Sequence, residues 1–280
     1  MPVIDAHTHV FPPEVVSHRT EIASKDASFG VLYGEPGARI VDGGGLAAYL
    51  EAEGIDLAFA TSFPFSDHGL VRLSNDYVIG LHAQDPRIVP FIALPMTNNR
   101  EGLKELERCE GRGAVGVGEV AFYGTGFGPG ERECLQPIAQ ALTERRFVLM
   151  LHVNEPVGHA YHGKVPIDFG ELALFIASHP DLTIILSHMG GGICFYEFMP
   201  EIRERFSRVY YDLAAVPYLY NPDIYRFVAE FIPHKTLFGS DYPLLPLSRY
   251  ERDMTDLDDA VTERILYGNA QRILRDARLG

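Results

Sequence analysis

The sequence has few basic residues, few cysteines and no long hydrophobic run, and each shortage excludes a class of protein. Its 24 Lys and Arg against 38 Asp and Glu give a formal net charge of −14, which disfavours general nucleic-acid binding because Lys and Arg neutralise phosphates. The three cysteines form no CxxC pair, which favours reduced thiols in a cytoplasmic protein over a disulfide framework or zinc ribbon. No apolar stretch reaches the ~20 residues that span a bilayer, and no secretory signal is visible, so no membrane partner is expected.

What is present indicates one folded α/β domain. The 280 residues are 46% hydrophobic and 22% charged, as in globular proteins, and no linker or low-complexity tract divides them. Apolar, strand-like runs occupy 2–7, 56–62, 88–94, 113–120, 147–153, 182–188, 209–213 and 236–240. Helix-like segments follow at 46–53, 71–84, 101–110, 131–145, 168–178, 221–231 and 262–275.

This alternation predicts βα units around a parallel sheet. Eight units in a chain of this length are most simply a (β/α)8 TIM barrel over residues 1–280, with a doubly wound open sheet as the alternative. A Pro- and Gly-rich segment at about 10–45 shows no clear periodicity and is predicted to be a capping loop.

Ionisable residues end five of the eight apolar runs, where a barrel places its functional side chains. They are His7, His9, Glu119, His152, His188 and Asp241. His7 and His9 lie two residues apart and therefore project to the same side of a strand. One such histidine is more often structural, but a convergence of six residues indicates a metal site, because a divalent cation relieves the repulsion between carboxylates. Imidazole and carboxylate together suit Zn, Mn, Fe or Co.

Four motifs carry a family resemblance. They are Asp-Ala-His-Thr-His-Val-Phe-Pro at 5–12, Ser-His-Met-Gly-Gly-Gly at 187–192, Phe-Gly-Ser-Asp-Tyr-Pro at 238–243 and Tyr-Gly-Asn-Ala-Gln-Arg-Ile-Leu at 267–274. Together they resemble the amidohydrolase superfamily, and within it the amidohydrolase-related (amidohydrolase 2 type) metal-dependent hydrolases. The resemblance runs from residue 3 to about residue 275. It implies a distorted (β/α)8 barrel with one or two divalent metals, and zinc is the first expectation.

The resemblance also implies roles for individual residues. His7 and His9 match the first-metal ligands of the family, and Asp241 matches its strand-eight ligand. His152 and His188 match histidines that bind a second metal or, in mononuclear members, act on the substrate. Asp241 and His188 are therefore the expected catalytic residues.

Glu119 departs from the pattern of most relatives. It takes the strand-four place where many of them have a carboxylated lysine that bridges two metals. TatD-type nucleases have a glutamate there, and decarboxylase-like relatives usually have no ligand. Glu119 therefore favours a two-metal site, with a salt bridge at the barrel mouth as the alternative.

The segment 154–164 follows the fifth run directly and is rich in His, Tyr and Lys. It should extend over the barrel mouth, so Asn154, His159, Tyr161 and Lys164 are predicted to bind substrate. Lys164 or His159 could hold a carboxylate or phosphate as a point charge. The alternative is a solvated polar loop.

The leading functional prediction is a metal-dependent hydrolase of a small amide, ester, lactone or phosphoester. In it, metal-activated water attacks and Asp241 accepts the proton. The alternatives are a metal-dependent decarboxylase of an aromatic or unsaturated carboxylic acid, a TatD-like nuclease, and a non-catalytic metal-binding barrel. The expected partner is a small molecule, and the oligomeric state stays open, with a homo-oligomer as one alternative.

Overall fold

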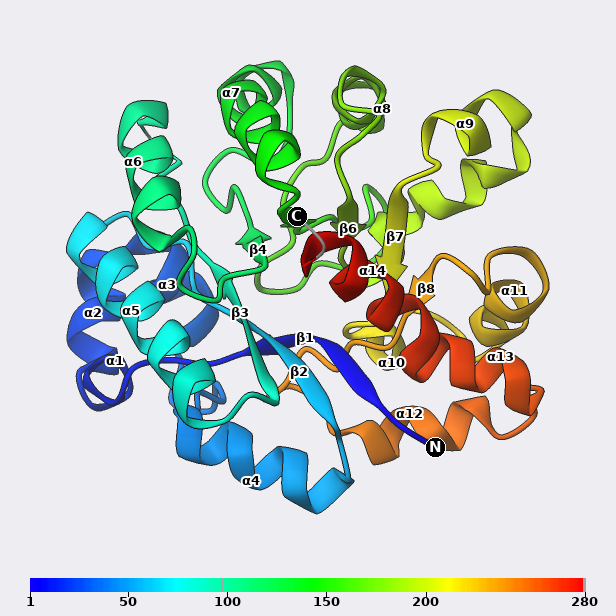
Figure 1. Cartoon of the computed structure of the whole chain (residues 1–280), viewed down its shortest axis with the longest axis horizontal. Helices are drawn as coiled ribbons and strands as arrows, with labels where there is room; N and C mark the ends of the chain where they lie inside the picture. Colours follow the sequence, from blue (N-terminus) through cyan, green and yellow to red (C-terminus); the bar gives the residue numbers. More distant parts are fainter. Residues whose placement is uncertain (97, 279–280) are drawn as a thin grey trace.

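Eight parallel strands form a barrel in sequence order. The computed structural model describes residues 1–96 and 98–278. Its strands are β1 (Ile4–His9), β2 (Leu57–Thr61), β3 (Ile88–Ile92), β4 (Gly116–Val120), β5 (Val148–Leu151), β6 (Ile184–Leu186), β7 (Val209–Asp212) and β8 (Thr236–Leu237). The Ala6 amide donates to the Phe238 carbonyl at 2.8 Å, and the Asp241 amide donates to the His7 carbonyl at 2.9 Å, so β1 also meets the end of β8. The predicted (β/α)8 barrel is confirmed (Figure 1).

Helices follow the strands and surround the barrel (Figure 1). They are α4 (Gly43–Glu53), α5 (His68–Gln84), α6 (Asn99–Cys109), α7 (Pro129–Arg145), α8 (Phe169–Ser178), α9 (Pro200–Arg205), α10 (Val216–Leu219), α11 (Asp223–Phe231), α12 (Leu247–Met254), α13 (Asp259–Glu263), η2 (Arg264–Gly268) and α14 (Asn269–Arg278). Asp42, Asp67, Asn98 and Asp168 cap α4, α5, α6 and α8 by accepting from first-turn amides. None of the described helices is long and apolar enough to cross a membrane.

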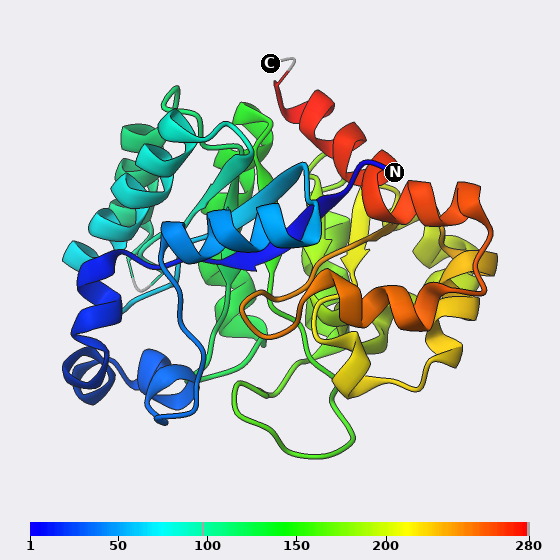
Figure 2. The ribbon, with the colours of Figure 1, turned by 90° about the horizontal axis from the view of Figure 1, so that it is seen from below.

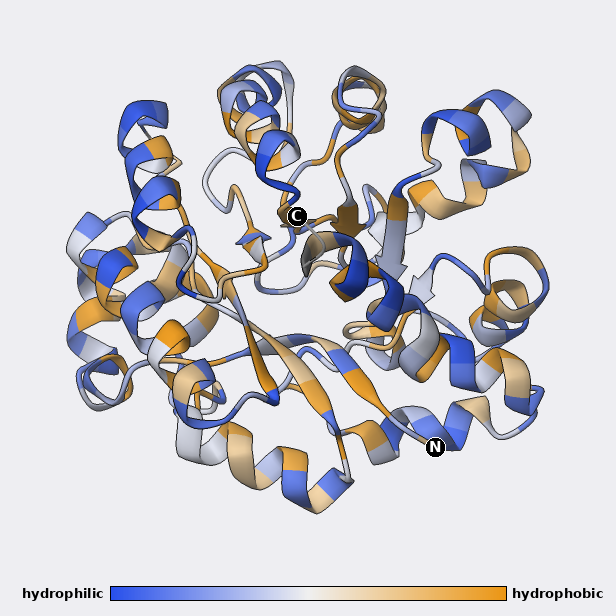
Figure 3. Ribbon diagram, viewed as in Figure 1, coloured by the Kyte–Doolittle hydropathy of each residue, from blue (hydrophilic) through white to orange (hydrophobic). Residues whose placement is uncertain are grey.

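Apolar side chains fill the interior of the barrel and the layer between the strands and the surrounding helices. Figure 3 shows hydrophobic residues along the strands and hydrophilic residues concentrated on the outer helices. Phe59 of β2 and Phe91 of β3 stack inside the barrel with ring centroids 5.0 Å apart. Ile273 and Leu274 of α14 join the same buried cluster. Because this cluster fills the interior beside α14, a functional site is expected at the carboxyl ends of the strands.

The segment before α4 contains three short helices, α1 (Pro13–Ser17), α2 (Arg19–Lys25) and α3 (Ala27–Tyr33). Phe11, Phe29 and Phe63 pack together beneath it, and the buried carboxylate of Asp26 accepts from the amides of Phe29 and Ser66. In Figure 2 this blue segment and the light-green connection between β5 and α8 extend from the same side of the barrel.

Candidate metal centre

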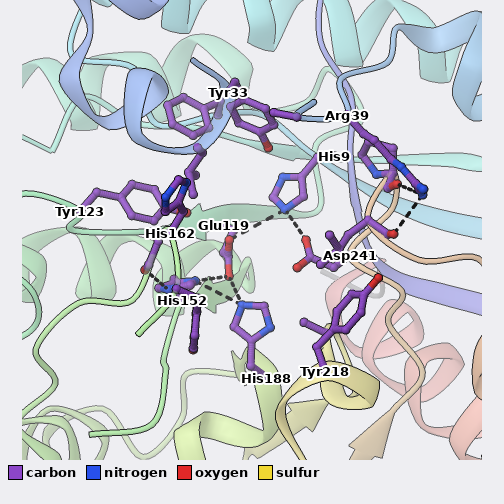
Figure 4. Close-up of a pocket in the computed structure, with 18 of the residues that line it drawn as sticks. His9, Tyr33, Arg39, Glu119, Tyr123, His152, His162, His188, Tyr218 and Asp241 are labelled. Carbon is purple, nitrogen blue, oxygen red and sulfur yellow. Dashed lines mark hydrogen bonds and ion pairs between the residues drawn. The ribbon is translucent and has the colours of Figure 1, made fainter. Parts of the chain in front are cut away.

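The strand ends bring the six predicted ionisable residues together. His7 and His9 lie on β1 and Glu119 on β4, while His152, His188 and Asp241 follow β5, β6 and β8 directly or within a few residues. Their ligand atoms form two groups, and within each group the atoms lie within 4.8 Å of one another. We call His7, His9 and Asp241 the first triad, and Glu119, His152 and His188 the second triad. Figure 4 shows five of the six side chains facing the centre of one pocket.

One carboxylate connects the two triads. In the first triad, His9 Nε2 lies 3.1 Å from both His7 Nε2 and Asp241 Oδ1. In the second triad, Glu119 Oε1 lies 3.1 Å from His152 Nδ1 and 3.5 Å from His188 Nε2. The other oxygen of Glu119, Oε2, lies 3.8 Å from His7 Nε2 and 3.9 Å from His9 Nε2. Glu119 can therefore reach a cation in either triad.

The histidines of the first triad use their outer nitrogens as donors. His7 Nδ1 lies 2.8 Å from the buried carboxylate of Asp212, which can only accept a proton. His9 Nδ1 lies 2.8 Å from the Thr61 hydroxyl, whose own proton goes to the Thr8 carbonyl at 2.9 Å. In its neutral form each imidazole therefore carries its proton on Nδ1 and turns the lone pair of Nε2 inward.

The histidines of the second triad follow the same rule. His188 Nδ1 lies 3.0 Å from the Ala214 carbonyl, and His152 Nε2 lies 3.2 Å from the Gly163 carbonyl. Carbonyl oxygens only accept, so in the neutral rings the inner nitrogens carry lone pairs. Four imidazole lone pairs and two carboxylates thus converge in a buried site. This donor set fits a divalent cation, with outer hydrogen bonds that fix the orientation of each ring.

The carboxylates change the proton affinity of the histidines. Burial lowers the pKa of His7, but Asp212, Glu119 and Asp241 outweigh it and raise the pKa to about 10. Burial likewise lowers the pKa of His188, but Glu119 and Asp241 raise it to about 9. Burial raises the pKa of Asp241, but His9 and His7 hold it well below its ordinary value. The site therefore attracts positive charge, either as protons or as a metal ion.

The backbone is constrained where it carries the site. His188 and Asp241 have φ values of 56° and 59°, a region that non-glycine residues seldom occupy. His188 begins η1 (His188–Phe198), which continues through Gly190, Gly191 and Gly192. A Cβ atom on Gly191 would lie 2.2 Å from the Asn154 carbonyl oxygen, so this close approach requires glycine.

A cavity of about 640 Å³ opens above the two triads. Of the four predicted substrate-binding residues, His159 and Tyr161 are among the described residues that line it, and Asn154 and Lys164 are not. Asn154 is fully buried and bonds the amide and carbonyl of Val165 at 2.8 and 2.7 Å. The Lys164 ammonium donates to two carbonyls of its own loop. Both side chains therefore hold the loop together, and their contact with substrate stays a prediction.

Two buried aspartates beside the site, Asp212 and Asp5, are not among the residues predicted from the sequence. Asp212 on β7 accepts from the amides of His188 and Ala214 at 2.8 and 3.1 Å, in addition to its bond with His7. Asp5 on β1 is buried and accepts from the amide and hydroxyl of Ser240, which ties β1 to the end of β8. Burial raises the pKa of Asp5 to about 6, although these hydrogen bonds oppose the rise.

Solved structures similar to this chain include several decarboxylases. 5-Carboxyvanillate decarboxylase from Sphingomonas paucimobilis has a TM-score of 0.74 at 19% identity, covering 98% of this chain and 99% of that chain. The enzyme from Novosphingobium aromaticivorans, complexed with manganese and 4-hydroxy-3-methoxy-5-nitrobenzoic acid, has a TM-score of 0.76 at 18% identity, covering 98% and 96%. A 2,6-dihydroxybenzoate decarboxylase complexed with 2,6-dihydroxybenzoate has a TM-score of 0.70 at 18% identity, covering 98% and 99%. No curated protein matches the chain.

These similarities correct the predicted hydrolysis of an amide, ester, lactone or phosphoester. The neighbours with a named activity are mostly decarboxylases, which favours the alternative prediction. The metal that their names mention is manganese, so they support a divalent cation but not zinc in particular.

The family is shown by the sequence itself. A profile of the family described as amidohydrolase matches residues 4–275, nearly the full length of the chain. The span agrees with the four motifs and with the barrel that carries them. The chain therefore belongs to the amidohydrolase family, a group of metal-dependent enzymes.

Proposed function

We propose that the chain is a metal-dependent decarboxylase of a small aromatic or unsaturated carboxylic acid. The observation that carries the proposal is the likeness of the barrel, over 98% of the chain, to decarboxylases of hydroxylated aromatic acids. The two triads beneath the cavity supply the groups that this reaction needs. Manganese is the metal we expect, because similar structures contain it.

We assign the cation to the first triad, with Glu119 as the fourth protein ligand through Oε2. Support comes from the inward lone pairs of His7 and His9 and from the Asp241 carboxylate, which lies 3.1 Å from His9 Nε2. A bound divalent cation supplies positive charge that attracts the substrate oxygens and stabilises the electron pair left by departing CO2. This assignment gives one ion per chain.

We assign proton delivery to the second triad. Decarboxylation breaks the bond between the substrate carbon and its carboxyl carbon, leaves the electron pair on the substrate carbon, and adds a proton there. His188 Nε2 and His152 Nδ1 lie 3.2 Å apart beside Glu119, so one proton can be held between the two rings. His188 lines the cavity and would deliver this proton, which solvent then replaces through the open mouth.

The proposal is tested by following the reaction in heavy water. Manganese-loaded protein is incubated with 2,6-dihydroxybenzoate, and CO2 and the product are measured by gas analysis and NMR. We expect CO2 together with deuterium on the carbon that lost it. If 2,6-dihydroxybenzoate releases no CO2, the proposed reaction is contradicted for the class of substrates on which it rests.

Two variants separate the roles of the triads. His188→Gln is expected to lower the turnover rate by about 10²–10⁴-fold, the range for a general acid, while it retains the metal. Asp241→Asn is expected to lose the metal. His234→Gln serves as the matched control, because His234 lies before β8 at the opposite end of the barrel. Full activity of His188→Gln would refute its role in proton delivery.

A further inference from the structure

Two tyrosines of the cavity have no part in either triad. Tyr33 ends α3, in the segment before α4, and Tyr123 follows β4 by three residues. Both line the cavity above the triads. Figure 4 shows them together on one side of the pocket, with Tyr218 on the other. They come from segments 90 residues apart, so the fold itself brings them to the same wall.

Their rings are fixed by packing. The Tyr33 ring lies 5.0 Å from the rings of both Phe11 and Phe29. The Tyr123 ring stacks on Phe63 at 6.1 Å with an interplanar angle of 6°. Phe63 also lies 5.8 Å from Tyr33, so one apolar ring supports both phenols. The positions of the hydroxyl groups are therefore set before any ligand binds.

Neither hydroxyl forms a hydrogen bond with another of the described residues. Other tyrosines of this barrel end do so: Tyr49 donates to Asp5 at 2.9 Å and Tyr161 donates to Glu155 at 2.9 Å. A half-buried hydroxyl without a protein partner is a donor available to a ligand or to water. Two such donors on one wall define a polar position in the cavity.

The charge around these hydroxyls favours a neutral partner. Burial raises the pKa of Tyr33 and of Tyr123, so the phenols stay protonated. Among the described lining residues, Arg39 is the one Lys or Arg. Its Nη1 donates to carbonyls beyond β8 at 3.2 and 3.4 Å, which holds the guanidinium on the side of the cavity away from Tyr123 (Figure 4). A second carboxylate on a substrate would therefore meet no free permanent cation on this wall.

We propose that Tyr33 and Tyr123 determine specificity by donating hydrogen bonds to a neutral oxygen of the substrate, a hydroxyl, methoxy or carbonyl oxygen. The substrate then carries one carboxylate, which the first triad and its cation receive, and no second carboxylate at the tyrosine wall. This inference rests on the proposed function, because that function places the reacting carboxylate at the metal. It concerns binding, so it can be tested without turnover.

The test measures dissociation constants by calorimetry on manganese-loaded protein. The ligands are benzoate, 3-hydroxybenzoate, 4-hydroxybenzoate, and the dicarboxylates that carry a second carboxylate in place of the hydroxyl group. We expect a hydroxyl group to lower Kd about tenfold, the value of a typical hydrogen bond into a prepared site. Tyr33→Phe or Tyr123→Phe should remove most of that gain and leave the Kd of benzoate within about twofold. Tyr196→Phe, on the outer surface, is the matched control.

Each outcome bears on a different claim. If the hydroxyl preference persists in both Phe variants, or if a dicarboxylate binds more tightly than the hydroxybenzoates, the inference is overturned while the proposed function stands. If the preference depends on the tyrosines but no CO2 is released from 2,6-dihydroxybenzoate, the inference stands and the proposed reaction fails. If no member of the series binds the metal-loaded protein, both are refuted.

Discussion

Replacing Asp212 with Asn should weaken metal binding without touching a metal ligand. Asp212 and His7 are both fully buried, and their 2.8 Å contact fixes the His7 proton on Nδ1. The other Asp212 oxygen accepts from the amides of His188 and Ala214. Asn offers one oxygen and one NH2 group, so in either orientation a donor faces a donor. If the NH2 group faces His7, the imidazole must shift its proton to Nε2 and lose the lone pair that binds the metal.

The magnitude follows from two costs. Loss of an outer partner of a ligating histidine lowers metal affinity by about 10–100-fold, or about 1.4–2.7 kcal/mol. An unmatched buried donor also lowers the free energy of unfolding by about 1–3 kcal/mol.

The assay is competition between the metal-free protein and a chelator for Mn²⁺, with circular dichroism to show that the variant is folded. Asp256→Asn, an exposed aspartate, is the control. A folded Asp212→Asn protein with the wild-type affinity would refute the argument that the Asp212–His7 contact sets the lone pair.

Three further predictions concern stability and metal uptake. Lys235→Met should lower the free energy of unfolding by about 3–5 kcal/mol in urea denaturation, because it leaves the buried Glu197 carboxylate without the ammonium that lies 2.6 Å away. Adding Glu197→Leu should restore much of this stability, and a Lys235→Met protein as stable as wild type would contradict the prediction. Gly191→Ala should lower the melting temperature more than Gly54→Ala. Both glycines have a positive φ, but only at position 191 would the added Cβ meet backbone atoms. An equal fall in melting temperature for the two variants would contradict the close approach at Gly191. Manganese affinity should fall as the pH is lowered from about 8 to about 6, because the cation must displace protons from histidines such as His7, whose pKa is about 10. An affinity that does not change with pH in metal titrations would contradict this prediction.

The barrel and its strand-end residues can be predicted from the sequence because both depend on local pattern. The run 2–7 and the seven later runs give the strands, since each is short and apolar and all but the run 182–188 are followed by a helix-like segment. Once the strands are parallel, the carboxyl ends of β1, β4, β5, β6 and β8 must meet. His7, Glu119 and Asp241 are therefore brought together by topology, although they are far apart in the sequence.

Other parts of the site depend on contacts that leave no local pattern. Asp212 ends the apolar run Val-Tyr-Tyr-Asp and so meets the same strand-end criterion, but nothing local shows that its carboxylate bonds His7, which lies 205 residues away. Tyr33 lies in a segment whose helices have only 5 to 7 residues, too short to show a periodicity. Lys164 is attractive as an anion ligand, yet carbonyls of its own loop take up its ammonium. The reaction class could not be predicted, because imidazoles and carboxylates around one cation can support both hydrolysis and decarboxylation.

The central claim is that one divalent cation, held at the first triad, supports decarboxylation. The most direct measurement titrates metal-free protein with Mn²⁺ and records the rate of CO2 release from 2,6-dihydroxybenzoate or another acid that the chain accepts. The account predicts that the rate rises linearly and stops rising at one equivalent per chain. CO2 release that needs two equivalents, or a rate that does not depend on metal, would contradict it.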